Sequence, residues 1–331
     1  MRVGRRGISL AGMLAATRMV AVGALVALVG AAPAPAAEVR ATLGGVDVAA
    51  WTPEGGDETT RWPVVVFSHA LGLCPAQARF LTTALAAAGY LVVAPYHADS
   101  ACELSVNVAD PARVALKPAN LWTDADYRNR AEDVVRALVA LSAGAEPGWR
   151  ADGTRVALVG HSLGGYTMLG LAGAWPSWPT PAGVRAVIAF SPYALPLLAN
   201  GAIERLVVPV MFQTGTQDMV FALPLTLGAG AYARAPAPKT LVEIEYGTHL
   251  AWTDAGVFRR DAIIATTLAF LDHHVRGLPE RAELLAAGGG VSSLLRDPPS
   301  RLPAVMQPSF AAQTLATVRE WWQRSRDLWP F

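Results

Sequence analysis

Gly160-His161-Ser162-Leu163-Gly164-Gly165 joins an apolar run at residues 155–159 to a segment of helical composition at residues 166–174. A Gly-x-Ser-x-Gly between a buried strand and a helix predicts a nucleophile elbow, a tight turn that lifts the serine hydroxyl above the sheet edge. Glycines flank the serine because such a turn strains the backbone and leaves no room for side chains. The N-terminus of the following helix favours negative charge developing near the serine. The stretch therefore predicts Ser162 as a nucleophile; the alternative is an incidental serine in a glycine-rich turn.

Two downstream residues are placed to complete a catalytic triad with Ser162. A serine hydroxyl is a weak nucleophile and needs a base, which in turn needs an orienting acid. After an elbow, the acid and then the histidine follow along the chain, each in a loop behind a strand. Asp218 follows the expected strand at 207–213, and His249 follows the expected strand at 240–246. We predict Asp218 as the acid and His249 as the base; the alternatives are a turn-forming aspartate and a surface histidine.

Two backbone N–H groups are expected to bind the oxyanion that forms on the substrate. One belongs to Leu163, the residue after the nucleophile. The second is expected in the loop at 68–72, which follows the apolar run at 63–67, and we assign it to Leu71.

Other polar residues are weaker candidates for the site. His161 occupies the variable position of the elbow, where we expect it to contact substrate or to pack in the pocket. Asp254 is the alternative acid. His69, His97 and His161 could together form a metal site, but no carboxylate pattern accompanies them. We expect neither a metal nor another cofactor.

The rest of the chain alternates apolar strands with helices. Continuous β-branched runs such as residues 63–67 are typical of strands buried on both faces. Strands are expected within 39–52 and at 63–67, 91–94, 155–159, 184–190, 207–213 and 240–246; helices are expected at 75–88, 125–142, 166–174, 223–233 and 258–275. Such alternation predicts an α/β fold in which helices cover both faces of a mostly parallel sheet.

The first 36 residues have the features of a secretory signal peptide. An arginine-containing start precedes an apolar run at 19–32, and Ala34-Pro35-Ala36 supplies small residues for cleavage. The apolar run is short for a membrane span, although retention as an uncleaved anchor is the alternative. We expect cleavage near Ala36 and a secreted or periplasmic protein with no transmembrane span in the mature chain.

Composition narrows the class of protein further. The 331 residues are 53% hydrophobic and 16% charged, enough apolar material for one large core and one or two domains. Without residues 1–36, 23 basic residues stand against 26 acidic ones, which gives no indication of nucleic-acid binding. Cys74 and Cys102 are the two cysteines, and in an exported protein such a pair is most simply a disulfide, with two buried thiols as the alternative.

Residues 278–331 differ in character from the rest. Glycines at 288–290 and prolines at 298–299 suggest linkers, and residues 310–328, which include Trp321 and Trp322, suggest a helix. We expect this tail to pack on its own domain; the alternatives are a lid over the site or a membrane-interface anchor. The expected division is a signal peptide at 1–36, a catalytic domain at 37–277 and a partly helical tail at 278–331.

Several stretches together resemble the α/β-hydrolases of the platelet-activating-factor acetylhydrolase and dienelactone hydrolase-like group, which shades into bacterial cutinase-like polyester hydrolases. They are PVVVFSHALG at 63–72, GYLVVAP at 89–95, RAED at 130–133, GHSLGG at 160–165 and FLDHH at 270–274. The resemblance covers roughly residues 60–277 and implies an eight-stranded, mostly parallel sheet. The tail after residue 277 matches nothing in the pattern.

The resemblance also implies roles for particular residues. It supports Ser162, Asp218 and His249 as the triad and the N–H groups of Leu71 and Leu163 as oxyanion donors. It places Tyr193 where cutinase-like members have an aromatic residue beside the substrate, and it suggests that a Cys74–Cys102 disulfide braces the pocket rim. One departure is Ala70, which stands where the family usually has glycine.

The combined expectation is a secreted serine carboxylic-ester hydrolase that forms an acyl-enzyme. Apolar residues in the loops, such as Leu71, Tyr193 and Leu195, favour an apolar acyl or aromatic ester, small or polymeric, over a charged substrate. The alternatives are a polyester or lipid hydrolase and a non-catalytic binding protein on the same fold.

Overall fold

The computed structural model describes Met1 and residues 37–102, 117–144 and 147–297. The expected signal peptide, most of the loop that follows residue 102 and the expected helix at 310–328 lie outside these residues.

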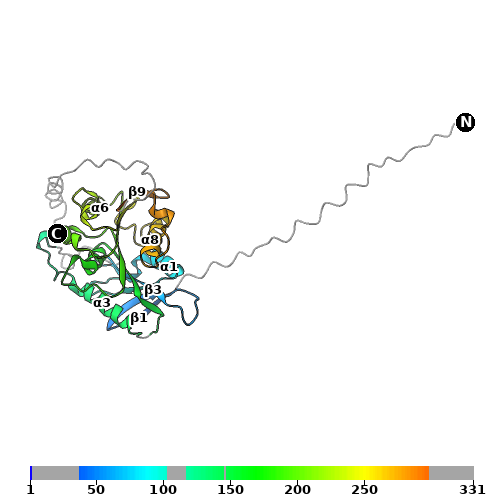
Figure 1. Ribbon diagram of the computed structural model, residues 1–331, viewed down its shortest axis with the longest axis horizontal. Helices are drawn as coiled ribbons and strands as arrows, with labels where there is room; N and C mark the ends of the chain where they lie inside the picture. Colours follow the sequence, from blue (N-terminus) through cyan, green and yellow to red (C-terminus); the bar gives the residue numbers. More distant parts are fainter. Residues whose placement is uncertain (2–36, 103–116, 145–146, 298–331) are drawn as a thin grey trace. The chain divides into compact units, whose positions relative to one another are not determined.

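In the described part of the chain, nine strands form one sheet in the order β1-β2-β4-β3-β5-β6-β7-β8-β9. Figure 1 labels the two edge strands, β1 and β9, and the inner strand β3. They are β1 Glu38–Leu43, β2 Val46–Trp51, β3 Trp62–Ser68, β4 Leu91–Pro95, β5 Ala151–His161, β6 Val184–Phe190, β7 Val210–Gly215, β8 Lys239–Ile244 and β9 Val291–Asp297. The pairings from β4 through β8 are parallel. Strands β1 and β2 at one edge and β9 at the other add antiparallel pairs. The expected mostly parallel α/β sheet is therefore confirmed.

Helices connect the strands on both faces of this sheet. They are α1 Arg79–Ala87, α3 Arg128–Ser142, α4 Leu163–Leu169, α5 Leu195–Ala199, α6 Met219–Thr226, α7 Ala231–Arg234 and α8 Arg260–His274, with single turns η1 Pro75–Ala78, η2 Ala119–Leu121, η3 Gly170–Ala174, η4 Ile203–Arg205 and η5 Ala282–Leu284. The helix expected at 223–233 is two short helices, α6 and α7. A Cβ on Gly230, between them, would lie 2.6 Å from the carbonyl oxygen of Pro224, so this reversal needs glycine.

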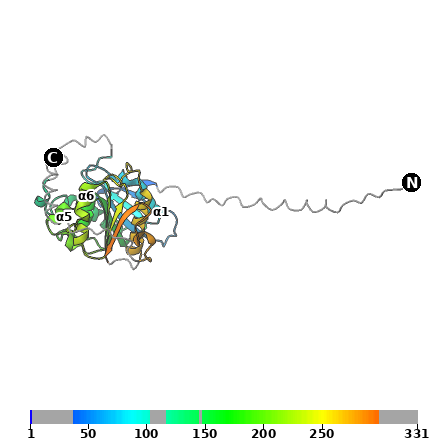
Figure 2. The same cartoon turned by 90° about the horizontal axis from the view of Figure 1, so that it is seen from above.

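Two apolar cores, one on each face, account for the continuous apolar runs of the strands. Val64 and Val66 of β3 join the core under α3 to α7, whereas Val65 and Phe67 join the core under α1 and α8. Figure 2 shows α5 and α6 on one side of the sheet and α1 on the other. Successive side chains of a strand point to opposite faces of the sheet. A strand covered on both faces is therefore apolar at every position and does not alternate with polar residues.

The ninth strand corrects the expected strand number of eight, and it comes from the segment expected to be a tail. Gly288, Gly289 and Gly290 all have positive φ, and they turn the chain back so that β9 pairs antiparallel with β8. These glycines form a turn into the sheet rather than a linker. The strand was missed because it is short and half-exposed, and glycines precede it. Among the described residues, no helix has the length and apolar character needed to cross a bilayer.

The carboxyl ends of the parallel strands bring distant loops to one edge of the sheet. Ser68 of β3 pairs in register with Gly160 of β5, and Gly215 of β7 pairs with Ile244 of β8. The loops that follow these strands therefore leave the sheet side by side, and they carry the predicted site residues.

Candidate active site

Ser162 lies on a strained turn between β5 and α4. Its φ of 56° and ψ of −116° fall in a region that non-glycine residues seldom occupy. A Cβ on Gly160 would lie 2.3 Å from the carbonyl oxygen of Gly164, and a Cβ on Gly164 would lie 2.0 Å from that of Ser68. The backbone thus approaches too closely for any side chain at either glycine, which is the geometry of a nucleophile elbow.

The structure brings Ser162, His249 and Asp218 into one hydrogen-bonded chain. Ser162 Oγ lies 3.1 Å from His249 Nε2, and His249 Nδ1 lies 2.9 Å from Asp218 Oδ2. The carboxylate side chain is 4% exposed, whereas the imidazole is 28% exposed. A buried carboxylate that accepts from Nδ1–H leaves Nε2 free to accept the serine proton, which is the arrangement of a general base.

Close contacts between the loops after β7 and β8 hold the acid and the base together. A Cβ on Gly215 would lie 2.1 Å from the carbonyl oxygen of Gly247, and the N–H of Gln217 donates to that same oxygen over 2.9 Å. The ring of Phe221, in the first turn of α6, stacks on the His249 imidazole with centroids 3.8 Å apart. The stacking on its ring face and the hydrogen bond to Asp218 together hold the imidazole in place.

His161 lies beneath the triad and is fully buried, so its position does not support the predicted contact with substrate. Its Nε2 donates to the carbonyl oxygen of His249 over 2.8 Å, and its Nδ1 accepts from Gln77 Nε2 over 3.0 Å. Burial, followed by the nearby His249, lowers the pKa of His161 well below its ordinary value, so the ring is neutral. The side chain supports the backbone of His249. The sequence could not show this, because the elbow position is compatible with either orientation.

The loop after β3 contains the predicted oxyanion donor Leu71. Within the described part of the chain, the N–H groups of Leu71 and Leu163 have no acceptor, whereas those of Ala70, Gly72 and Leu73 are all used. Ala70 N–H donates to Gln77 Oε1, Gly72 N–H to Asp99 and Leu73 N–H to the Ala70 carbonyl. Two free donors beside a candidate nucleophile are what an oxyanion hole requires.

A second, buried group of polar residues lies behind this loop and was not identified from the sequence as a unit. Ser68 Oγ lies 2.9 Å from His97 Nε2, and His97 Nδ1 lies 2.9 Å from Asp133 Oδ2. Arg130 of α3 is fully buried and forms a bidentate ion pair with Asp99. The one available signal was the Arg130 to Asp133 stretch of the resemblance, which assigned no role to either residue.

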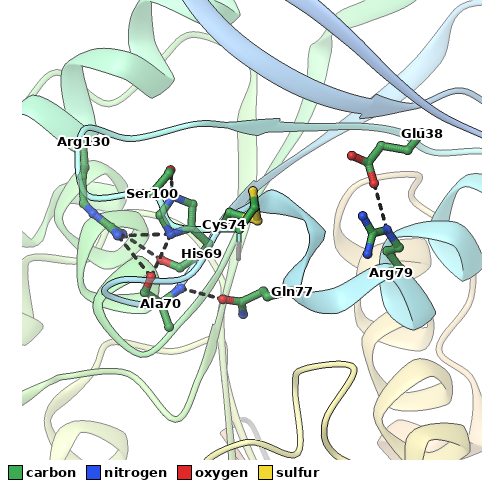
Figure 3. The surroundings of a disulfide bond; sticks show 9 residues. Glu38, His69, Ala70, Cys74, Gln77, Arg79, Ser100 and Arg130 are labelled. Carbon is green, nitrogen blue, oxygen red and sulfur yellow. Dashed lines mark hydrogen bonds and ion pairs between the residues drawn. A yellow bond between two sulfur atoms is a disulfide. The ribbon is translucent and has the colours of Figure 1, made fainter. Parts of the chain in front are cut away.

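The Cys74–Cys102 disulfide is present and lies next to this buried group (Figure 3). It joins the end of the loop after β3 to the segment after β4, and the N–H of Ala101 also donates to the carbonyl of Leu73 over 3.0 Å. The expectation that the two cysteines are bonded to each other is confirmed. The bond fixes the segment that carries His97 and Asp99.

Two further candidates occupy different surroundings. Tyr193 follows β6, donates its N–H to the carbonyl of Ser162 over 3.0 Å and packs edge-on against Trp122. Burial raises the pKa of Tyr193 to about 12, so its phenol stays protonated. Asp254 accepts from the N–H of Phe80 instead of from His249, which leaves Asp218 in the position of the acid.

The ring nitrogens of His69, His97 and His161 are engaged by protein groups. His69 Nδ1 donates to the carbonyl of Ala70 over 2.7 Å, and its Nε2 accepts from Ser100 over 2.7 Å. The other two rings have the partners described above. The arrangement fits three neutral, hydrogen-bonded side chains and offers none of them as a metal ligand.

Comparison with known proteins adds one finding. Residues 39–138 match the family model of platelet-activating factor acetylhydrolase, isoform II. The match includes the loop after β3 and the buried group with Arg130, and it ends before the elbow. A search among curated proteins gave no match. The sheet order, the elbow and this match together identify the protein as having the α/β-hydrolase fold, with similarity over residues 39–138 to platelet-activating factor acetylhydrolase, isoform II.

Proposed function

We propose that this protein is a serine ester hydrolase that works through an acyl-enzyme. The observation that carries the proposal is the hydrogen-bonded chain from Ser162 through His249 to Asp218, built on a strained turn at the sheet edge. The family match supports an esterase- or lipase-type reaction, because the matched family is named for hydrolysis of an acetyl ester.

In the proposed reaction, Ser162 Oγ attacks the ester carbonyl while His249 Nε2 takes the hydroxyl proton. Asp218 keeps Nδ1–H in place and stabilises the imidazolium. The carbonyl oxygen becomes an oxyanion that accepts from the N–H groups of Leu71 and Leu163. His249 then protonates the leaving alcohol. In the second half, His249 Nε2 takes a proton from water as the water oxygen bonds to the acyl carbon; the bond to Ser162 Oγ then breaks, the proton passes to Oγ and the carboxylic acid leaves.

The side chains around His249 favour an apolar substrate. Phe221 covers the imidazole, while Met219 and Leu250, which directly follow Asp218 and His249 in the chain, are 66% and 48% exposed. Tyr193, next to Ser162, adds a mostly apolar surface with a protonated phenol. We therefore propose an apolar acyl or aromatic ester as substrate, and a lipid or polyester as the extended version of the same chemistry.

We also propose that the protein is exported and that its N-terminal segment is removed near Ala36. The disulfide supports an oxidising compartment, because such bonds persist outside the cytosol. Strand β1 begins at Glu38, so cleavage at this point would leave the sheet intact.

The test is the intact mass of the protein after incubation with a fluorophosphonate, followed by peptide mapping. The parent chain is expected to take up one adduct on the peptide that holds Ser162, because only an activated serine reacts. Ser162→Ala is expected to take up none. Ser68→Ala is the matched control, since Ser68 is also bonded to a histidine that is paired with an aspartate, and the variant is expected to retain one adduct.

A folded parent protein that takes up no adduct would contradict the esterase proposal and favour a non-catalytic binding protein on this fold. An adduct that disappears in Ser68→Ala and persists in Ser162→Ala would show that Ser68, and not Ser162, is the nucleophile. If Ser162 is labelled, hydrolysis of p-nitrophenyl esters of increasing acyl length then defines the substrate range.

A further inference from the structure

The peptide unit between Ala70 and Leu71 determines where the Leu71 N–H points. A trans peptide is planar, so its carbonyl and its N–H point in opposite directions. The Ala70 carbonyl accepts from His69 Nδ1 over 2.7 Å, from Leu73 N–H over 3.2 Å and from Arg130 over 3.4 Å. As long as this oxygen is held toward the interior, the Leu71 N–H is held away from it.

The preceding peptide unit is held in the same way. The carbonyl of His69 accepts from Arg130 over 2.8 Å, and the N–H of Ala70 donates to Gln77 over 2.9 Å. Figure 3 shows the Arg130 side chain directed at both carbonyls. The loop itself starts against the elbow, because the Ser68 carbonyl approaches Gly164 too closely for a Cβ there.

Arg130 uses all five of its N–H groups within this buried group. Nε and one Nη2 hydrogen bind Asp99 over 2.9 and 2.7 Å. Nη2 also lies 3.4 Å from the Ala70 carbonyl oxygen and 3.3 Å from His69 Nδ1; because that nitrogen donates its own proton to the Ala70 carbonyl, the second Nη2 hydrogen is left for the carbonyl oxygen. The two Nη1 hydrogens face the His69 carbonyl and, over 3.4 Å, Ser68 Oγ. Only a guanidinium offers five donors in a fixed plane, so lysine cannot reproduce these contacts.

We propose that Arg130 is a positioning residue for catalysis: by holding the His69 and Ala70 carbonyls, it keeps the Leu71 N–H directed into the oxyanion hole. Asp99 anchors the guanidinium and also accepts from the N–H of Gly72 over 3.1 Å, on the other side of Leu71. Three of the six polar contacts that surround Leu71 thus come from this one ion pair: those to the His69 carbonyl, the Ala70 carbonyl and the Gly72 N–H. The proposal rests on the proposed ester hydrolase function, since it concerns an oxyanion.

The environment of the neighbouring histidine agrees with this arrangement. Burial and then the Arg130 charge lower the pKa of His69 well below its ordinary value, so this ring is neutral and carries one proton. That proton lies on Nδ1 when the ring donates to the Ala70 carbonyl and accepts from Ser100. The loop therefore keeps its hydrogen bonds across the neutral pH range.

The experiment compares Arg130→Lys with Arg276→Lys on the full chain. Arg276, two residues after the end of α8, is the matched control, because it also binds an aspartate and a backbone carbonyl, those of Asp272 and Ala88. For each variant we would measure kcat and KM for p-nitrophenyl butyrate, the affinity for an alkyl trifluoromethyl ketone, and Tm. The ketone forms a hemiketal with the serine and so places an oxyanion in the hole.

Arg130→Lys is expected to lower kcat and the ketone affinity together by about 10- to 100-fold, with KM changed less than about twofold. Arg276→Lys is expected to lower Tm without changing the ketone affinity. If Arg130→Lys does not fold, Asp99→Asn serves instead, with a loss of about three- to tenfold in the same two quantities.

Parent-like kcat and ketone affinity in the folded Arg130 variant would overturn this inference alone. Equal losses in both lysine variants would also overturn it, since the effect would then follow stability. A parent chain that neither hydrolyses the ester nor binds the ketone would overturn the proposed function and this inference with it.

Discussion

The described part of the molecule contains two hydrogen-bonded chains of side chains, each made of a serine, a histidine and an aspartate, with almost the same hydrogen-bond distances. Ser162, His249 and Asp218 are linked over 3.1 and 2.9 Å. Ser68, His97 and Asp133 are linked over 2.9 and 2.9 Å. The first chain has a partly exposed imidazole, and the second has an imidazole with no exposed surface.

The difference lies in the backbone and in access to solvent. Ser162 has positive φ on a turn beyond the end of its strand region, whereas Ser68 is the last residue of β3 and is fully buried. Arg130 also donates toward Ser68 Oγ, which occupies a lone pair of that hydroxyl. We therefore expect Ser162, on its strained turn and beside a partly exposed imidazole, to be the nucleophile, and we expect Ser68 not to be one.

Replacing each aspartate by asparagine is expected to give the largest difference between the two hydrogen-bonded chains. Asp218→Asn is expected to lower kcat by about 1,000- to 10,000-fold with little change in stability, because an amide cannot hold the imidazole in the productive tautomer. Asp133→Asn is expected to act mainly on stability, costing about 1–2 kcal/mol through the hydrogen bonds to His97 and Arg136.

Initial rates and urea unfolding of both variants separate these effects. A loss of kcat in Asp133→Asn as large as that in Asp218→Asn would mean that the buried chain takes part in the chemistry.

Removing the disulfide sharpens the contrast between the two sites. Cys74 and Cys102 are separated by 28 positions in the sequence, and the disulfide between them lies beside the buried chain of Ser68, His97 and Asp133. The double variant Cys74→Ser with Cys102→Ser is expected to lower the free energy of unfolding by about 3–4 kcal/mol, chiefly by freeing the unfolded chain.

Ser162 in that variant should still be labelled by the fluorophosphonate, because the loops that carry Ser162, Asp218 and His249 contain neither cysteine. Unchanged urea denaturation would show that the ion pair of Arg130 and Asp99 is enough to fix this segment.

The pH dependence of stability should arise from the buried histidines. Burial lowers the pKa of His97 to about 4, against 6.5 for the ordinary value. Between these pH values the unfolded chain binds a proton that the folded chain refuses, so stability falls as the pH drops from about 6.5 to 4. His97 alone should contribute a loss of about 3 kcal/mol over that range.

Urea unfolding at pH 7 and pH 5 for the parent and His97→Gln tests this expectation. The variant is expected to be less stable at pH 7 and to lose less stability on acidification. An equal pH slope in both proteins would assign the effect to other groups, such as His69 or His161.

The contrast also shows what could be predicted from the sequence. The positions of Ser162, Asp218 and His249 follow from one local signal, the elbow, and from the order of strands along the chain. The structure brings these three together as that order requires. Their catalytic roles remain a prediction, to be decided by the labelling experiment.

Other features depend on burial and on pairing between distant positions. Ser68 and His97 are 29 residues apart, and Arg130 reaches the His69 carbonyl across 61 residues. No local pattern shows whether such a histidine or arginine faces a pocket or the interior, which is why the sequence leaves the orientation of His161 open and indicates no role for Arg130. Strand β9 was missed for a related reason: an edge strand is partly exposed, so its sequence shows only a weak pattern of apolar residues.

Strand β9 also changes the edge that the sheet presents to other molecules. The outer side of a sheet edge can recruit strands from other molecules, and charged side chains there oppose such pairing. Residues Arg296 and Asp297 close β9, and Glu38 and Arg40 lie on β1 at the opposite edge. By covering the apolar β8, β9 replaces an aggregation-prone border with a charged one. Both edge strands of the sheet in the described residues thus carry charged residues.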